Sequence, residues 1–125
     1  MVALPILIMA LGSNHNQQQH VKEAMAGLNR LFGGIRFTSQ VWTEPIGIQS
    51  DKFLNCLAYV KTPYNINQIK KAIKHIETEC GDSEALRKRH VINLDIDILL
   101  HGKTMFHKQD WNRDYIIKLL KEIEQ

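Results

Sequence analysis

The segment Asn93–Ile98 reads Asn-Leu-Asp-Ile-Asp-Ile, and this strict alternation of polar and apolar residues indicates the fold class. Successive side chains of a β-strand point to opposite faces of the sheet, so the alternation predicts a strand with one buried face. The buried face would carry Ile92, Leu94, Ile96 and Ile98, and the open face Asn93, Asp95 and Asp97. We expect helices to cover the apolar face and to leave the aspartate face free for a ligand or another layer.

Asp95 and Asp97 lie two residues apart on the open face, with backbones about 6.5 to 7 Å apart at roughly 3.3 Å per residue. Two carboxylates this close repel each other, which raises one pKa and destabilises the strand unless a cation is present. Mg²⁺ prefers such oxygen ligands and is commonly held by one or two carboxylates together with substrate phosphates. Aspartate is disfavoured within strands, which favours a metal site over the alternative, the solvated face of an ordinary amphipathic strand.

Hydrophobic periodicity and turn residues predict the other elements. We expect strands at residues 4–11, 35–42, 53–61 and 91–100, and helices at 21–32, from 66 to Gly81, and at 111–123. Asn65 and Gln68 have the spacing of a capping box before the second helix, and the polar segment 81–90 favours a mobile loop. This order of elements predicts an α+β, ferredoxin-like fold with an antiparallel sheet, helices on one face and an extra C-terminal helix.

The predicted strand at 53–61 also separates its side chains into two sets. One face would carry Leu54, Cys56, Ala58 and Val60, and the other Phe53, Asn55, Leu57 and Tyr59. An amide flanked by apolar residues in a central strand needs a hydrogen-bond partner, and the edge of a heterocycle is one of several that would serve.

The composition is that of a soluble globular protein. Of its 125 residues 44% are hydrophobic and 23% charged, so we expect one domain, 1–125, with a core that needs no disulfides. A net charge of +3 argues against a nucleic-acid binder with a broad basic face. Cys56 and Cys80 lack metal-binding spacing and are expected to be reduced thiols of a cytoplasmic protein. The apolar start, about ten residues, is too short to cross a membrane, and we expect a monomer.

Several short motifs resemble the hydroxymethyldihydropterin pyrophosphokinase family of folate biosynthesis. The resemblance extends from about Leu4 to Ile123, and the order and spacing of the motifs make it specific. The motifs are Leu11-Gly12-Ser13-Asn14, Thr43-Glu44-Pro45-Ile46-Gly47, Phe53-Leu54-Asn55, Ile76-Glu77 with Gly81, Leu94-Asp95-Ile96-Asp97-Ile98-Leu99, and His107 followed by Arg113 and Tyr115. Members of the family have a ferredoxin-like fold and transfer the β,γ-diphosphate of ATP to the hydroxymethyl group of the pterin, releasing AMP.

The resemblance implies roles for the matching residues. Asp95 and Asp97 would be the catalytic, metal-binding pair, holding two Mg²⁺ ions that bridge the triphosphate and the attacking hydroxyl. The expected pterin contacts are Thr43, Ile46, Phe53, Asn55 and Tyr115, with the two aromatic rings around the pterin and Asn55 at its amide edge. The expected ATP contacts are Glu77, Arg87, Lys88, His107 and Arg113. Without the resemblance, the aromatic residues would be read as core, and His107 and Arg113 as surface.

The departures from the family are concentrated in one segment. Asp82, Glu84 and Ile92 stand where members of the family usually carry arginines, and Arg89-His90-Val91 replaces a tryptophan-glycine-proline approach to the last strand. The segment between Lys103 and His107 is also shortened. These changes make the local potential partly phosphate-repelling, although Arg87, Lys88 and Arg89 lie on the same segment and could compensate.

Three functions therefore remain open from the sequence. The first is an active pyrophosphokinase with a diverged loop, and the second is a pterin- or nucleotide-binding homologue with little or no turnover. The third, a ferredoxin-like RNA-binding module, is disfavoured by the low net charge, the aspartates on the open face and the lack of an aromatic-rich RNA-binding strand.

Overall fold

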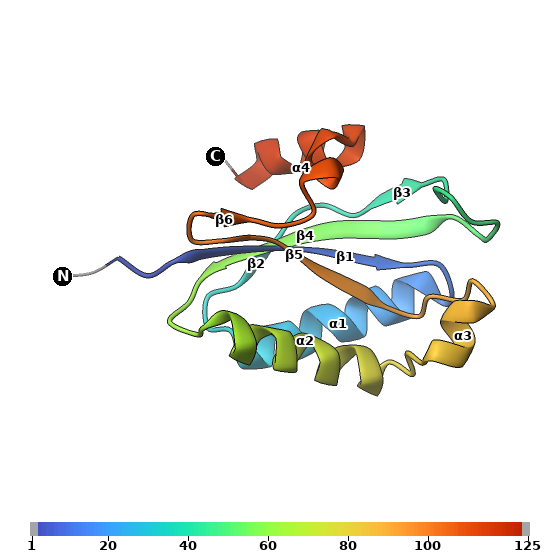
Figure 1. The fold of residues 1–125 in the computed structure, drawn as a ribbon, viewed down its shortest axis with the longest axis horizontal. Coiled ribbons are helices and arrows are strands. Elements are labelled where there is room, and N and C mark those ends of the chain that lie inside the picture. The colour runs from blue at the N-terminus through green and yellow to red at the C-terminus, as the bar shows by residue number, and fades with distance from the viewer. Residues whose placement is uncertain (1–2, 124–125) are drawn as a thin grey trace.

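The computed structural model describes residues 3–123, and they form a sheet between two layers of helix (Figure 1). In chain order the elements are β1 (Ile6–Ser13), α1 (Gln17–Leu31), β2 (Arg36–Phe37), β3 (Val41–Thr43), β4 (Phe53–Lys61), α2 (Ile66–Glu79), α3 (Glu84–Lys88), β5 (Asp95–His101), β6 (Thr104–Met105), the 3₁₀ helix η1 (Lys108–Asn112) and α4 (Asp114–Ile123). None of the helices described is long and apolar enough to span a membrane.

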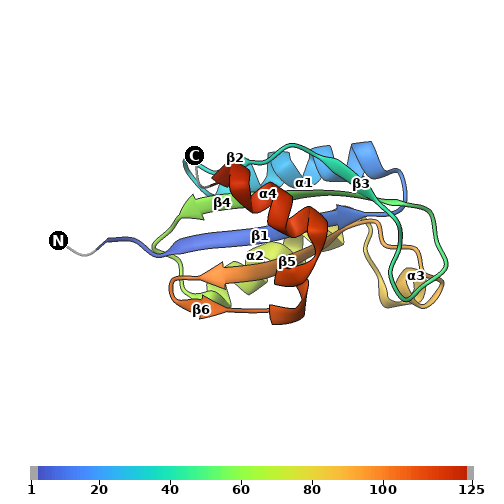
Figure 2. The ribbon, with the colours of Figure 1, turned by 90° about the horizontal axis from the view of Figure 1, so that it is seen from above.

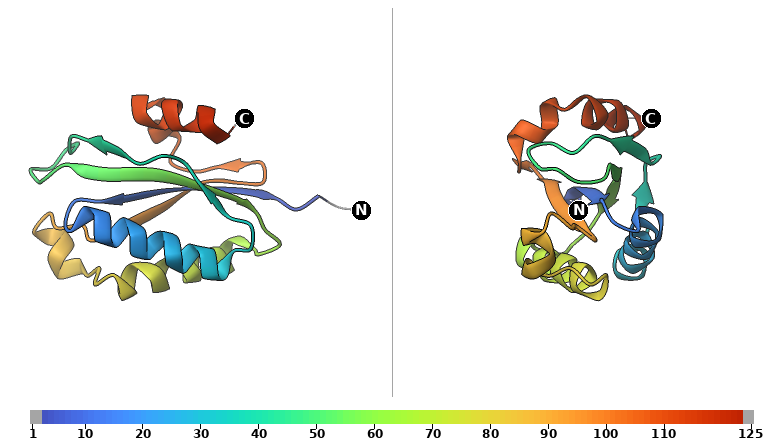
Figure 3. Two further views of the ribbon diagram at one scale, coloured as in Figure 1. Left: turned by 180° about the vertical axis from the view of Figure 1, so that it is seen from behind. Right: turned by 90° about the vertical axis from the view of Figure 1, so that its right-hand side faces the viewer.

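The sheet has the order β2-β4-β1-β5-β6, with β3 also paired to β4, and all recorded pairings are antiparallel. The helices α1 and α2 lie side by side against one face, whereas α4 crosses the opposite face (Figures 1 and 2). The end-on view in Figure 3 shows the sheet between these two layers. The predicted α+β, ferredoxin-like arrangement with an added C-terminal helix is therefore confirmed.

The two faces of β4 pack as its alternation predicts. Leu54, Cys56, Ala58 and Val60 belong to the core beneath α1 and α2. Leu57 and Tyr59 pack on the other face against Ile116 and Leu119 of α4. The helices begin and end at identifiable signals: Asn65 and Gln68 form the expected capping box before α2, and Gly81 follows the helix with a φ of 84°.

The strand predicted at residues 35–42 is interrupted, so that β2 and β3 are separate. The Thr38 hydroxyl accepts a hydrogen bond from Leu57 N at 2.9 Å, while Thr38 N donates to Leu57 O, also at 2.9 Å. A side-chain oxygen thus replaces a backbone carbonyl in the ladder, which interrupts the regular pairing between β2 and β3.

The aspartate strand begins at Asp95, four residues later than Val91, where we expected it. Asn93 does not share the face of the aspartates, because its amide Nδ2 donates to Cys80 O at the end of α2, 3.0 Å away. The preceding backbone is held instead by Asn14, whose Oδ1 accepts from Ile92 N at 2.7 Å. The expected open face of this strand therefore consists of the two aspartates alone.

Other boundaries also differ from the predictions: β1 spans Ile6–Ser13 where residues 4–11 were expected, and α2 ends at Glu79, two residues before Gly81. The segment 81–90 contains the short helix α3, begun by the Ser83 hydroxyl, which accepts from Leu86 N at 3.2 Å. The first helix starts at Gln17, four residues before the first apolar position of its buried stripe. The closing helix starts at Asp114, and the residues before it form η1; the two-residue strand β6 was not predicted.

Candidate functional site

A cavity of about 260 Å³ opens on the α4 side of the sheet, beside the aspartates. Its wall includes all five residues expected to contact a pterin: Thr43, Ile46, Phe53, Asn55 and Tyr115. They come from β3, the loop after it, β4 and α4, so segments far apart in the chain meet here. Asp95 and Asp97 line the same cavity. The structure therefore brings the predicted pterin residues and the predicted metal pair into one place, which we call the central cavity.

The floor of the central cavity includes Gly12 of β1, which pairs with Asn55 on one side and Asp95 on the other. A Cβ atom at Gly12 would lie 3.1 Å from Asn55 Oδ1 and 3.6 Å from the Phe53 ring. Glycine therefore keeps the space beside Asn55 and Phe53 open. The motif Leu11-Gly12-Ser13-Asn14 contains this residue. That the position must be glycine depends on which residues of the neighbouring strands lie beside it, and a single sequence does not show this register.

The Asn55 amide is oriented by hydrogen bonds inside the protein. Its Nδ2 donates to Thr43 Oγ1 at 2.8 Å and lies 3.3 Å from the carbonyl oxygens of Val41 and Phe53. Because the nitrogen is used by the protein, the oxygen Oδ1 is the group that faces the cavity floor at Gly12. Asn55 is thus arranged to accept a hydrogen bond from a ligand.

Asp95 and Asp97 project from adjacent same-face positions of β5, and their side chains are 37% and 33% exposed. Burial and, next, the neighbouring Asp95 carboxylate together raise the pKa of Asp97 to about 7. The basic side chain beside Asp97 is that of His107, whose Nε2 is 3.8 Å from Asp97 Oδ1. Asp97 is therefore short of positive charge, as expected of a Mg²⁺ ligand, whereas Asp95 Oδ1 is 3.2 Å from Arg87 Nη2.

Among residues 3–123, no group of three or more histidine, cysteine or acidic side chains could hold a metal ion. The two aspartates alone fit the way Mg²⁺ is usually bound, through one or two carboxylates, with water and substrate phosphates as the remaining ligands. The donor chemistry therefore suits a cation that arrives with a phosphate-bearing ligand better than a permanently bound structural ion.

Arg87 of α3 contacts one of the two aspartates, Asp95. Its Nη2 donates to Leu94 O at 3.0 Å and to Asp95 Oδ1 at 3.2 Å, and its Nε donates to Asp82 Oδ1 at 2.6 Å. Glu77 Oε2 is 3.8 Å from Nη2. Arg87 is a predicted ATP contact, whereas sequence reasoning treated Asp82 only as a loss of positive charge.

A second cavity, of about 300 Å³, lies between α2 and β5. We call it the lateral cavity; its wall includes Lys70, Lys74, Glu77, Asp97 and His107. Asp97 lines both cavities. The Glu77 carboxylate is nearly buried and accepts from Ile96 N at 2.9 Å, and burial raises its pKa. Two of the five predicted ATP contacts, Glu77 and His107, therefore meet at this second hollow.

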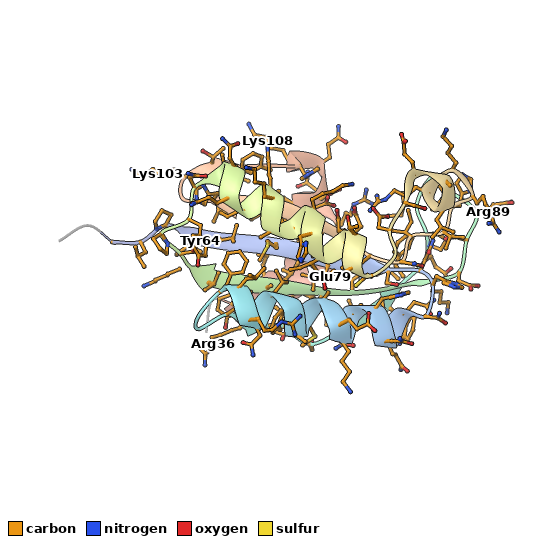
Figure 4. All side chains as sticks on the ribbon, turned by 90° about the horizontal axis from the view of Figure 1, so that it is seen from below. Arg36, Tyr64, Glu79, Arg89, Lys103 and Lys108 are labelled. Carbon is orange, nitrogen blue, oxygen red and sulfur yellow. The ribbon has the colours of Figure 1, made fainter. Side chains whose placement is uncertain are left out.

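The remaining predicted ATP contacts are distributed differently. Arg113 lines the central cavity and is paired with Asp110, whose Oδ1 is 2.9 Å from Arg113 Nε. Asp110 also lines this cavity and was not among the predicted site residues. Lys88 is exposed on α3 and lines neither cavity. Arg89, labelled in Figure 4, lies at the outer end of the α3 segment, far from Lys103 at the opposite end of the molecule.

Comparison with known proteins identifies the family of the chain. The model of the 7,8-dihydro-6-hydroxymethylpterin-pyrophosphokinase family matches residues 8–125. The chain belongs to this family. The match covers both cavities and the aspartate strand, so the resemblance noted from short motifs is confirmed.

A curated relative supports the assignment to the pyrophosphokinase family. The "Folate synthesis bifunctional protein, mitochondrial" of Pisum sativum is 28% identical over 130 residues. The alignment covers 94% of this chain and 25% of the relative, so the chain spans about a quarter of that protein's length.

Proposed function

We propose that this chain transfers the diphosphate of ATP to the hydroxymethyl group of 6-hydroxymethyl-7,8-dihydropterin, with Mg²⁺, and releases AMP. The observation that carries the proposal is the position of Asp97, which lines the central and the lateral cavity. A reaction between two substrates needs their reacting groups side by side, and a shared carboxylate at the junction provides a place for the metal between them.

The central cavity is the proposed pterin site. Phe53 and Tyr115 would bind the two faces of the ring, and the Asn55 oxygen would accept a hydrogen bond from a nitrogen on its edge. Thr43 holds the Asn55 amide at 2.8 Å and so contributes through orientation, whereas Ile46 adds apolar contact at the rim. Gly12 keeps the floor open to a flat ligand.

The lateral cavity is the proposed site for the nucleotide. Lys70 and Lys74 of α2 supply positive charge at its wall, His107 supplies ring nitrogens, and Asp97 lies at the end shared with the central cavity. Two Mg²⁺ ions bound with ATP would neutralise the negative charge that develops on the transferred phosphoryl groups. Asp95 and Asp97 would hold the metal, while Arg87 would contact phosphate from the α3 side and Arg113 from the α4 side.

The second candidate function is binding of pterin and nucleotide without transfer of the diphosphate, and a specific observation favours it. Asp82 and Glu84 place two carboxylates where the family usually has arginines, and Arg87 is engaged by Asp82 and Asp95. A protein with this arrangement could bind pterin and nucleotide without transferring the diphosphate.

Incubation of the protein with Mg-ATP and 6-hydroxymethyl-7,8-dihydropterin, followed by chromatography, separates the two functions. We expect AMP and the pterin diphosphate in equal amounts. Asp95→Ala and Asp97→Ala should each remove the products, because each deletes half of the metal site. Pterin binding without any product in the unaltered protein would establish the binding function and exclude the enzyme.

A further inference from the structure

Asp82 is an acidic residue at a place where related enzymes usually carry arginine, and its charge alone would repel phosphate. Its environment indicates a different role. The Asp82 side chain is only 5% exposed, and its Oδ1 accepts from Arg87 Nε at 2.6 Å. A buried carboxylate with a charge-assisted hydrogen bond is oriented toward its partner and screened from the solvent beyond it.

The backbone brings these two side chains together from different elements. Asp82 follows α2, and its N–H donates to Glu77 O at 3.0 Å. Arg87 lies in the last turn of α3, and its N–H donates to Ser83 O, also at 3.0 Å. The side-chain contact therefore ties α3 to the end of α2 and sets the direction of the Arg87 guanidinium.

The guanidinium is fixed at its Nε and Nη2 ends and free at the third nitrogen. Nε is bound by Asp82, and Nη2 donates to Leu94 O and Asp95 Oδ1. Among residues 3–123, Nη1 donates to no protein oxygen. A guanidinium carries five N–H donors in a rigid plane, so fixing Nε and Nη2 also fixes the direction of the Nη1 donors.

We propose that Asp82 is a positioning residue that orients Arg87 beside Asp95, so that Nη1 can donate to a phosphate oxygen of ATP. This inference rests on the proposed function, because it assumes that the triphosphate reaches Asp95. Asp82 then raises the affinity for Mg-ATP through Arg87. The charge-only interpretation requires the opposite, since a carboxylate near phosphate would lower that affinity.

The sign of one substitution separates the two interpretations. Asp82→Asn removes a negative charge and with it the charge-assisted hydrogen bond that holds Arg87, since a neutral amide oxygen is a weaker acceptor, and we expect the dissociation constant for Mg-ATP to rise about tenfold. Arg87→Gln should have a similar effect, and the double variant should bind no more weakly than Arg87→Gln alone, because Asp82 acts through Arg87. Equal or tighter binding by Asp82→Asn would overturn the proposal.

Glu84→Gln is the matched control. Glu84 is exposed on α3, two residues from Asp82, and makes no salt bridge or side-chain hydrogen bond with the residues described. Its removal eliminates the same charge without touching Arg87, so Mg-ATP binding should stay the same or become slightly tighter. A tenfold loss in this variant as well would overturn the proposal, because it would show that any carboxylate of this segment has the effect.

Two further measurements exclude a merely structural ion pair. Asp82→Glu keeps the charge but lengthens the side chain, so it should displace the guanidinium and weaken Mg-ATP binding, with pterin binding unchanged. In nuclear magnetic resonance spectra, the Arg87 Nε–H should exchange slowly with solvent in the unaltered protein and rapidly in Asp82→Asn. Full Mg-ATP affinity in Asp82→Glu, or fast exchange in the unaltered protein, would refute the positioning role.

Mg-ATP binding by the unaltered protein separates a failure of the proposed Asp82 role from a failure of the proposed function. Calorimetric titration with Mg-ATP should show binding before any variant is compared. Pterin binding without Mg-ATP binding would refute the nucleotide site and, with it, the role of Asp82. Mg-ATP binding that Asp82→Asn strengthens would refute only the role of Asp82.

Discussion

Replacing Asp97 by asparagine should stabilise the ligand-free protein, although it removes a proposed metal ligand. Burial and the Asp95 carboxylate raise the pKa of Asp97 from an ordinary 3.8 to about 7. A raised carboxyl pKa means that the folded protein disfavours the charged form, so the folded state binds a proton that the unfolded state releases. Stability should therefore fall as pH rises from about 4 to about 7, and the full cost should persist above this range.

The size of this effect follows from the difference between the two pKa values. About 3 pKa units correspond to roughly 4 kcal/mol at 1.36 kcal/mol per unit. The Asp97 side chain is 33% exposed, so solvent screens part of this cost, and we expect about 1 to 2 kcal/mol. For a chain of this length, the melting temperature of Asp97→Asn at pH 8 should be about 4 to 8 °C higher.

Thermal unfolding between pH 4 and pH 8, without divalent ions, measures the effect. The unaltered protein should lose stability over this range more steeply than Asp97→Asn, and Mg²⁺ should raise the melting temperature of the unaltered protein but not that of Asp97→Asn. Asp51→Asn, which removes an exposed carboxyl outside both cavities, should follow the unaltered protein. A melting temperature of Asp97→Asn at pH 8 equal to or below that of the unaltered protein would refute the charge-repulsion argument.

Three other substitutions or modifications test parts of the account. Asn14→Ala removes the acceptor of Ile92 N and should lower the free energy of unfolding by about 1 to 2 kcal/mol in chemical denaturation, because a half-buried donor loses its partner. Gly12→Ala places a methyl group 3.1 Å from Asn55 Oδ1 and should weaken pterin binding about tenfold in calorimetry, with Mg-ATP binding unchanged. Burial raises the pKa of the Cys56 thiol to about 12, so alkylating reagents should label it at pH 8 only after unfolding; labelling of the native protein would contradict its burial.

Local patterns predicted which side chains share a face, because alternation along a strand depends only on neighbouring residues. This is why Phe53 and Leu57 lie on the face of the sheet that α4 covers, and Leu54 on the face that α1 and α2 cover. Alternation also placed Asp95 with Asp97 and Phe53 with Asn55, whereas Thr43, Ile46 and Tyr115 were named from the family resemblance alone, and all five pterin contacts stay predictions. The capping box at Asn65 is equally local and was correct.

Errors occurred where a distant residue determines the local structure. The start of β5 depends on Asn14, 78 residues before Ile92, whose side chain occupies the backbone donor that would otherwise extend the strand. The break between β2 and β3 depends on a hydroxyl–backbone hydrogen bond to Leu57, 19 residues away from Thr38. Alternation contains no information about such contacts.

The proposed role of Asp82 could not be predicted, because a sequence shows that a residue is charged but not which side chain it contacts. Its position predicted repulsion of phosphate, whereas in the structure the carboxylate is buried against Arg87. The pairing requires α3, and this helix was not predicted because five residues with mixed charges give too little periodicity. The two cavities depend in the same way on the packing of α4 and α2, which places Tyr115 and Glu77 beside β5 from opposite faces.

The most direct test of the central claim follows a labelled phosphorus atom from the nucleotide to the pterin. ATP labelled at the β-phosphorus is incubated with the protein, Mg²⁺ and 6-hydroxymethyl-7,8-dihydropterin, and the products are separated. A metal site at Asp95 and Asp97 that joins the two cavities predicts the label in a pterin diphosphate and unlabelled AMP, with no product from Asp97→Ala. Label retained in ATP or ADP, or unchanged transfer by Asp97→Ala, would contradict the account.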